Sequence, residues 1–290
     1  MISSEDLSKI INTDSRATNR LMNALCGMGL LRKVKDKFYN TDISSKYLVE
    51  GKPDFMGNLY HTNHLWNTWN YLTGSVKEGS SFAGDQNKKE KEEWVDSFIA
   101  AMHYRGIKQA KLIAMMIDLS NSKKILDVGG GSAAFSMEIV KRNPAIKATV
   151  LDLPHVIPLT KNYVEQEGLI NNFDFIEGNY LSQDFGKDYD IILLSAIVHI
   201  NSYEQNKMII RKCADALNQN GIVIINDFIM NEDRTQPYHG AIFSINMLVG
   251  TASGDTYTEE EMKEWFKSAG FSKIERKKTS FASDLMIGTK

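Results

Sequence analysis

Residues 124–136, KILDVGGGSAAFS, decide the fold of this chain. An apolar run that contains one acid, Asp127, leads into three successive glycines, and a helical pattern begins after Ser132. Glycine lets a backbone approach a ligand closely, and the start of a helix offers unpaired N–H groups. The stretch therefore predicts a strand, a tight turn and a helix that bind a nucleotide-like ligand at Gly129 and Gly131.

A second acid follows at the end of the next apolar stretch, where Asp152 stands about 20 residues after the loop, at the spacing of a ribose-binding carboxylate. An NAD-binding loop has the same features, because Gly129, Gly131 and Ala134 satisfy the permissive dinucleotide fingerprint. Two details favour an adenosyl methyl donor over NAD, and both over a purely structural turn. Asp127 is placed to meet the amino group of a methionine moiety, and the unit lies in mid-chain.

Short apolar strands and helical stretches alternate around this loop. Such alternation predicts an α/β domain with a parallel sheet that helices cover on both faces. The expected elements span residues 124–128, 134–141, 148–151, 156–166, 173–176, 191–195, 203–217 and 221–227.

The first part of the chain has a different pattern. Ser4 and Asp14 are positioned to cap two short helices, and residues 30–33 and 37–41 are expected to form a small hairpin, as in a winged helix. Two longer helices, residues 55–72 and 91–117, flank a polar segment that predicts a domain hinge. We expect domains at residues 1–85 and 86–290. The segment contains Gly74, Gly79, Ser80, Ser81 and Gly84.

Composition excludes several classes of protein. The 290-residue chain has a net charge of -2, which gives no general attraction to nucleic acid. Two cysteines, Cys26 and Cys213, stand far apart without metal-ligand spacing, and a reducing cytoplasm is the simplest setting. We expect no signal peptide and no membrane span, because no run approaches about 20 apolar residues.

The segment ILDVGGGSAAFSMEIVKRNPAIKATVLDLPHVI, residues 125–157, closely resembles the small-molecule O-methyltransferase family that includes plant caffeic acid and acetylserotonin methyltransferases and many bacterial members. The likeness continues through Gly178-Asn179-Tyr180, His199 and residues 258–271. It implies a class I methyltransferase domain, which is Rossmann-like with a mostly parallel seven-stranded sheet, behind an N-terminal winged-helix dimerisation domain. It also implies S-adenosylmethionine as the donor, S-adenosylhomocysteine as a product, no metal and a homodimer.

A candidate general base, His199, lies just beyond the expected strand 191–195, at the edge where open α/β sheets bind ligands. The resembling family usually has His-Asp-Trp here, and this chain has His199-Ile200-Asn201. The resemblance implies that the histidine accepts the proton of the methyl acceptor; the alternative is that it caps a helix that begins near Ser202. Asp227, at the end of the next strand, is placed to hold the imidazole ring.

One departure from the family concerns its second catalytic glutamate, where this chain has Thr256. Either one carboxylate suffices, or Glu259 takes that place. The departure leaves open a C- or N-methyltransferase, or a member whose chemistry has drifted. The motif His199-Ile200-Asn201 motivates another alternative, a non-catalytic cofactor-binding protein, and the winged helix motivates a DNA-binding regulator. The last would use Arg16, Arg20 and the wing lysines, which nearby acids dilute. The chain also lacks the family's additional first helices, which bears on the size of the dimer.

The resemblance assigns further contacts. Asn179 would face the adenine, Tyr180 would stack on it and Ser195 would contact the donor, each with plain packing as the alternative. The acceptor would be small, hydroxylated and aromatic, and Met102 and Met247 are its favoured contacts. The residues implied to line its pocket are Phe98, Met102, His103, Tyr104, Phe243 and Met247.

Overall fold

The computed structural model describes residues 1–52, 54–56, 58–81 and 88–290, and it contains two compact units, Met1–Leu59 and Tyr60–Lys290. The expected domain boundary at residue 85 falls inside the second unit. Part of the polar segment expected as a hinge is helix α5 (Leu72–Glu78), which packs on α10 (Tyr238–Gly250). Ser75, in the middle of this helix, is fully buried. Gly84 lies outside the described residues.

The first unit has the expected order of helix, helix and hairpin. Ser3, rather than Ser4, caps the first helix by accepting from the Asp6 N–H, and Asp14 caps the second by accepting from the Ala17 N–H. The two strands pair antiparallel. The elements are α1 (Ser4–Ile10), α2 (Ser15–Gly27), β1 (Leu31–Val34), β2 (Lys37–Asn40) and α3 (Asp42–Tyr47).

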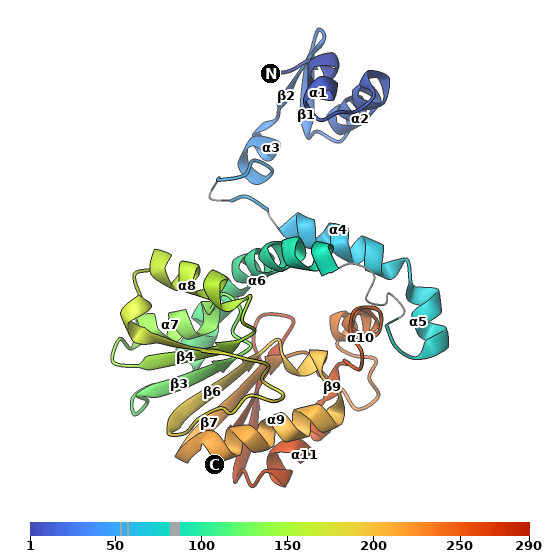
Figure 1. Ribbon diagram of the computed structural model, residues 1–290. Coiled ribbons are helices and arrows are strands. Elements are labelled where there is room, and N and C mark those ends of the chain that lie inside the picture. Colours follow the sequence, from blue (N-terminus) through green and yellow to red (C-terminus); the bar gives the residue numbers. More distant parts are fainter. Residues whose placement is uncertain (53, 57, 82–87) are drawn as a thin grey trace. The chain divides into compact units, whose positions relative to one another are not determined.

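A seven-stranded sheet organises the second unit, in the order β10-β11-β7-β6-β3-β4-β5 (Figure 1). The five strands from β7 to β5 are mutually parallel, and β10 runs in the same direction; β11, between β7 and β10, is antiparallel to both neighbours. This arrangement confirms the predicted mostly parallel sheet. The strands are β3 (Lys124–Val128), β4 (Lys147–Asp152), β5 (Phe173–Glu177), β6 (Tyr189–Ser195), β7 (Leu217–Asp227), β10 (Lys273–Lys277) and β11 (Asp284–Thr289).

Helices cover both faces of this sheet (Figure 1). Alternate residues of each strand enter different cores: Leu126 and Val128 pack with α9 and α11, and Ile125 packs with α6, α7 and α8. This period of two is what a sheet buried on both faces requires. The helices of the second unit are α4 (Asn58–Trp69), α5, α6 (Lys88–Met116), α7 (Ala134–Arg142), α8 (Ile157–Gln166), α9 (Tyr203–Ala216), α10 and α11 (Glu259–Ser268).

The order of the strands creates a crevice between neighbouring connections. From β3 the chain proceeds to β4 and β5 on one side, and it later returns to β6 and β7 on the other. The loops that leave β3 and β6 diverge at this switch point, where open α/β sheets bind their ligands. Two very short strands, β8 (Ile229–Met230) and β9 (Tyr257–Thr258), pair beside it. No helix among the described residues is long and apolar enough to cross a membrane.

Candidate active site

The glycine loop is held to the neighbouring strand by its own backbone. The Gly129 N–H donates to the Leu151 carbonyl at 2.7 Å, and the Gly131 N–H donates to Asp152 Oδ2 at 2.8 Å. Both glycines have positive φ, +62° and +57°, which side chains with a Cβ seldom adopt. A Cβ on Gly129 would also overlap Ile197 Cδ1. Local geometry and a close neighbour therefore both require glycine here.

The acid before the loop, Asp127, lies in β3 and packs against Gly130 of the loop. Its side chain is 1% exposed, and Oδ2 accepts a hydrogen bond from Ser136 Oγ at 2.6 Å. Burial raises the pKa of this carboxyl to about 6; the Ser136 hydrogen bond opposes the rise, and the charge of Asp152 adds to it. A Cβ on Gly130 would lie 2.8 Å from Asp127 Cγ. Its contact with a methionine amino group stays a prediction.

The second acid, Asp152, ends β4 with a half-buried carboxylate. Oδ2 accepts from the Gly131 N–H, and Oδ1 accepts from the Leu153 N–H at 2.7 Å. Burial raises the pKa of Asp152, and these two backbone N–H groups act against the rise. Each oxygen keeps a lone pair, so the side chain fits a pair of ribose hydroxyls.

The three other residues assigned to the donor lie in different settings. The Tyr180 ring borders the loop, with Cε1 3.7 Å from where a Gly129 Cβ would stand. Asn179 is exposed, and its Oδ1 accepts from the Leu181 N–H at 2.9 Å. This bond within the turn uses one of the two lone pairs of the amide oxygen. Ser195 is half-buried at the end of β6.

Across the crevice, His199 and Asp227 contact each other. His199 lies in a short 3-10 turn, Val198–Ile200, and its Nδ1 is 2.9 Å from both Oδ1 and Oδ2 of Asp227, which ends β7. The Phe228 N–H donates to Asp227 Oδ1 at 2.8 Å, and the carboxylate is 2% exposed. His199 Nε2 makes no hydrogen bond with a residue that the structure describes. A neutral ring held this way carries its proton on Nδ1 and offers Nε2 as an acceptor.

The structure decides between two alternatives at this histidine. Ser202, not His199, caps α9, because its hydroxyl accepts from the Gln205 N–H and the Gln205 side chain accepts in return. The helix-cap interpretation of His199 is therefore wrong.

Thr256 stands where the resembling family has its second catalytic glutamate, and the structure shows its surroundings. Thr256 is 2% exposed, and its carbonyl accepts from Arg234. Glu259 pairs with Lys263 at 3.0 Å and with Arg276 at 3.1 Å. Burial raises its pKa, but the hydrogen bonds from those two cations lower it by more, so the net direction is down. Among the described residues Asp227 is thus the carboxylate that contacts His199.

The residues expected to contact the acceptor lie on two helices. Phe98 and Met102 are one turn apart on α6, and Met247 is buried on α10. Phe243, one turn before Met247, meets the His199 ring edge-on with the ring centroids 4.8 Å apart. His103 lies beside the glycine loop instead: its Nδ1 is 2.9 Å from Ser132 Oγ, and its ring stacks on Tyr163 at 4.2 Å.

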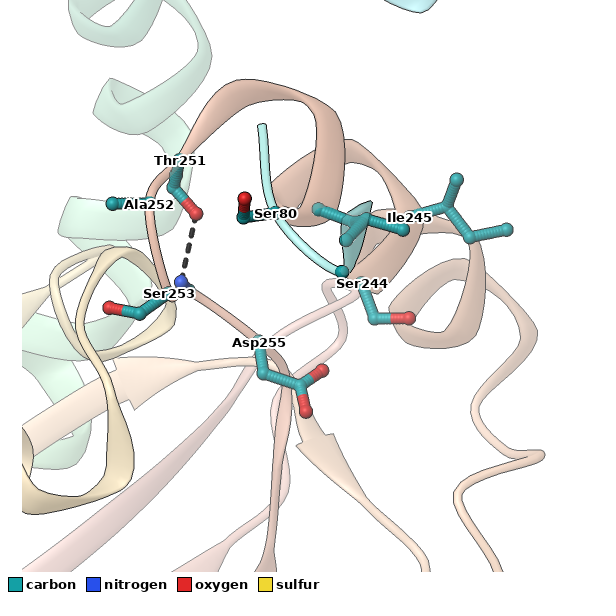
Figure 2. Close-up of a pocket in the computed structure, with 10 residues that line it drawn as sticks. Ser80, Ser244, Ile245, Thr251, Ala252, Ser253 and Asp255 are labelled. Atoms are coloured by element: carbon teal, nitrogen blue, oxygen red, sulfur yellow. Dashed lines mark hydrogen bonds between the residues drawn. The ribbon is translucent and has the colours of Figure 1, made fainter. Parts of the chain in front are cut away.

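A cavity of about 370 Å³ lies on the face of α10 that carries Ser244, Ile245 and Leu248 (Figure 2). These side chains are rotated around the helix from Phe243, and His199 does not line the cavity. A second cavity, about 190 Å³, lies between His103, Met137 and Glu167. We therefore define the site by the glycine loop and His199. Within the described ranges, no three His, Cys, Asp or Glu side chains form a group that could hold a metal.

Three contributing residues were missing from the sequence interpretation: Ser136, Ile197 and Asn201. Ser136 lies one turn into α7, at a spacing from Asp127 that could have suggested the contact. Ile197 and Asn201 are in the connection after β6, where no periodicity predicts which side chains point inward. Their contacts depend on how separate strands are placed.

Comparisons with known proteins identify what this arrangement resembles. A family model described as an O-methyltransferase domain matches residues 69–272. The 3-hydroxy-5-methyl-1-naphthoate 3-O-methyltransferase of Streptomyces sahachiroi is 31% identical over 265 residues, which cover 89% of this chain and 76% of the relative.

Two solved structures share the fold. A putative O-methyltransferase from Nostoc punctiforme has a TM-score of 0.83 at 27% identity, over 99% of this chain and 89% of that one. Human N-acetylserotonin methyltransferase in complex with SAM has a TM-score of 0.81 at 22% identity, over 100% of this chain and 87% of that one. The resemblance drawn from residues 125–157 is confirmed.

Proposed function

The chain belongs to the O-methyltransferase family, and we propose that it transfers a methyl group from S-adenosylmethionine to a hydroxyl of a small aromatic acceptor, with His199 as general base. The relative from Streptomyces sahachiroi is named for a hydroxynaphthoate, an acceptor of this class. The single observation that carries the catalytic part is the contact between His199 Nδ1 and both carboxylate oxygens of Asp227.

The donor side fits S-adenosylmethionine in two respects. A glycine loop with no Cβ at Gly129 and Gly131 lets the methionine and ribose parts approach its backbone closely, and Asp152 offers an acceptor lone pair on each carboxylate oxygen. When bound, the sulfonium supplies an electrophilic methyl group and leaves as a neutral thioether. We assign Asn179, Tyr180 and Ser195 to the same side as further contacts, and Asp127 to the support of the loop.

The base side fits removal of a hydroxyl proton. As the acceptor oxygen forms its bond to the methyl carbon and the carbon–sulfur bond breaks, the hydroxyl proton moves to His199 Nε2. Asp227 stabilises the imidazolium that results and fixes the ring with Nδ1 protonated beforehand. Phe243 limits the movement of the ring edge. Met102, Phe98 and Met247 supply an apolar surface suited to an aromatic ring.

Calorimetry and turnover test the proposal together. The protein should bind S-adenosylhomocysteine and should not bind NAD. With a panel of hydroxylated naphthoates and phenols, the products should carry the new methyl on oxygen. His199→Ala should keep donor binding and lower kcat by about 100- to 10,000-fold. Binding of NAD alone would contradict the methyl donor, and methylation at carbon or nitrogen would contradict the hydroxyl acceptor. Unchanged turnover in H199A would contradict the role of His199 as the base.

We also propose that the protein is a cytoplasmic homodimer that uses residues 1–85 for association. Large apolar side chains are exposed in the first unit, which is unusual for a surface in contact only with water. A mass by light scattering of twice the chain mass would support the dimer, and a monomer mass independent of concentration would refute it. The exposed side chains include Ile10, Ile11, Leu21, Met28 and Ile43.

A further inference from the structure

A buried amide, Asn201, occupies the position where the resembling family usually carries the tryptophan of His-Asp-Trp. Its side chain is in a residue only 3% exposed, where an unpaired polar group would be costly. Oδ1 accepts from the Tyr180 hydroxyl at 3.1 Å, and Nδ2 donates to the Ile197 carbonyl at 2.9 Å. Both ends of the amide are therefore satisfied by residues from different connections.

The two partners of this amide both border the glycine loop. Ile197 Cδ1 stands so close to Gly129 that no Cβ fits there, and Tyr180 Cε1 lies 3.7 Å from the same point. One amide thus bonds the Tyr180 side chain and the Ile197 backbone, and both residues border the donor site next to Gly129.

The same residue closes the turn that carries His199. The bond from Nδ2 to the Ile197 carbonyl spans residues 197–201, with His199 at the centre. The Asn201 carbonyl accepts from the Tyr257 hydroxyl at 2.6 Å, and the Val198 carbonyl accepts from Asn206 Nδ2 at 2.8 Å. Backbone bonds of the 3-10 turn, from the Ile200 N–H to the Ile197 carbonyl at 3.2 Å and from the Asn201 N–H to the Val198 carbonyl at 3.4 Å, add to these side-chain bonds. Both kinds of bond together hold His199 opposite Asp227.

We propose that Asn201 is a positioning residue that couples the two halves of the site: its Oδ1 holds Tyr180 for the donor, and its Nδ2 holds the turn of His199 for proton removal. The inference rests on the proposed function. The two tasks need an acceptor and a donor in one side chain, which an amide provides. Aspartate provides only the acceptor when ionised, and tryptophan provides only one donor.

Two variants test the Oδ1 bond and the Nδ2 bond of the Asn201 amide separately. Tyr180→Phe deletes the hydroxyl that binds Oδ1, and it should raise the Kd of S-adenosylhomocysteine about tenfold while changing kcat much less. Asn201→Asp keeps an acceptor for Tyr180 and loses the donor to Ile197. It should lower kcat at least about tenfold and shift the pH profile of kcat, because His199 moves relative to Asp227, with a smaller change in Kd.

A double mutant tests the coupling directly. Asn201→Ala should raise the Kd and lower kcat, and adding Y180F should raise the Kd no further, because the single variant has already removed that bond. The matched control is Asn172→Ala, whose Nδ2 donates to the Pro144 and Ile146 carbonyls at 2.9 and 3.1 Å before β5, at the opposite edge of the sheet. This control should leave Kd and kcat unchanged.

Thermal unfolding shows whether each variant folds. If N201D does not fold, Tyr257→Phe, which removes the bond to the Asn201 carbonyl, should lower kcat with little change in Kd. An unchanged kcat in N201D, or in Y257F if N201D does not fold, would overturn the inference. Additive effects of N201A and Y180F on the Kd would also overturn it. A wild-type protein that neither binds S-adenosylhomocysteine nor methylates any phenol would instead contradict the proposed function.

Discussion

The two sides of the crevice satisfy a buried carboxylate in opposite ways. On the donor side, Asp127 is 1% exposed and receives one hydroxyl, from Ser136, and burial raises its pKa to about 6. On the base side, Asp227 is 3% exposed and receives the His199 ring and the Phe228 N–H. The difference shows that equally buried carboxylates can have different partners: the first acid bonds a serine beside the glycine loop, and the second holds the ring of His199, which we propose as the base.

The two sides also differ in what fixes their shape. The glycine loop is fixed by backbone N–H groups and by the absence of side chains, whereas the position of His199 is fixed by side chains from three segments. Changes on the base side should therefore act mainly on turnover, and changes on the donor side mainly on binding and stability.

The largest expected effect is at Asp227. Asp227→Asn should lower kcat by roughly 100- to 10,000-fold, because an amide neither stabilises the imidazolium nor enforces the productive tautomer. The Kd of S-adenosylhomocysteine should stay within about threefold, well under the tenfold step that 1.4 kcal/mol represents. Steady-state kinetics and calorimetry check this, with Asp215→Asn, at an exposed position on α9, as the control. Loss of donor binding in D227N would end the division between the two sides.

A smaller effect is expected at Gly129. Gly129→Ala should weaken donor binding by tenfold or more and cost about 1–3 kcal/mol of stability, because the φ of +62° disfavours alanine and the new methyl overlaps Ile197. Adding Ile197→Ala relieves only the overlap and should restore part of the stability. Chemical denaturation measures both variants, and wild-type stability in G129A would show that the loop tolerates side chains.

The charge of Asp127 predicts a pH dependence of stability. With a pKa of about 6 in the folded protein and an ordinary aspartate pKa of 3.8 in the unfolded chain, the native state keeps a proton that the unfolded chain loses. The contribution is fully present below about pH 4 and is lost as the pH rises through about 6. Its size is about 3 kcal/mol at 1.36 kcal/mol per pKa unit.

Asp127→Asn removes this titration. The difference in unfolding free energy between wild type and D127N should therefore fall by about 2.4 kcal/mol from pH 4 to pH 7, because the carboxyl of the unfolded chain is already partly ionised at pH 4. Urea denaturation across this range tests it. Asp174→Asn, at an exposed position, should run parallel to the wild type. A difference independent of pH would mean that Asp127 is ionised throughout.

The smallest effects concern two alanines with positive φ, one on each side. Ala196 is exposed at φ +58°, so Ala196→Gly should stabilise the protein by about 0.5–1 kcal/mol. Ala133 has φ +61° but is fully buried, so Ala133→Gly relieves strain and loses packing in about equal amounts. Equal gains in the two variants would show that the buried methyl contributes nothing.

The sequence by itself determined the local elements and the family. The strand before the loop, the helix from Ala134 and the strands around Asp152 and Asp227 all lie within a few residues of their predicted bounds, because period-two and period-3.6 patterns are local properties. The resemblance of residues 125–157 identified the family for the same reason, since the glycine turn is a continuous stretch.

Only the tertiary structure decided which side chains meet. Asn201 meets Tyr180 across two connections, and residues 72–78 form a helix on α10 although their small residues suggested a hinge. Each of these contacts depends on strand order and helix placement, which arise from the burial of two cores at once. A pattern within one segment cannot specify a distance to another segment. The pairing of Asp227 with His199 was predictable because the two residues follow neighbouring strands, whereas the partners of Asn201 and of residues 72–78 were not.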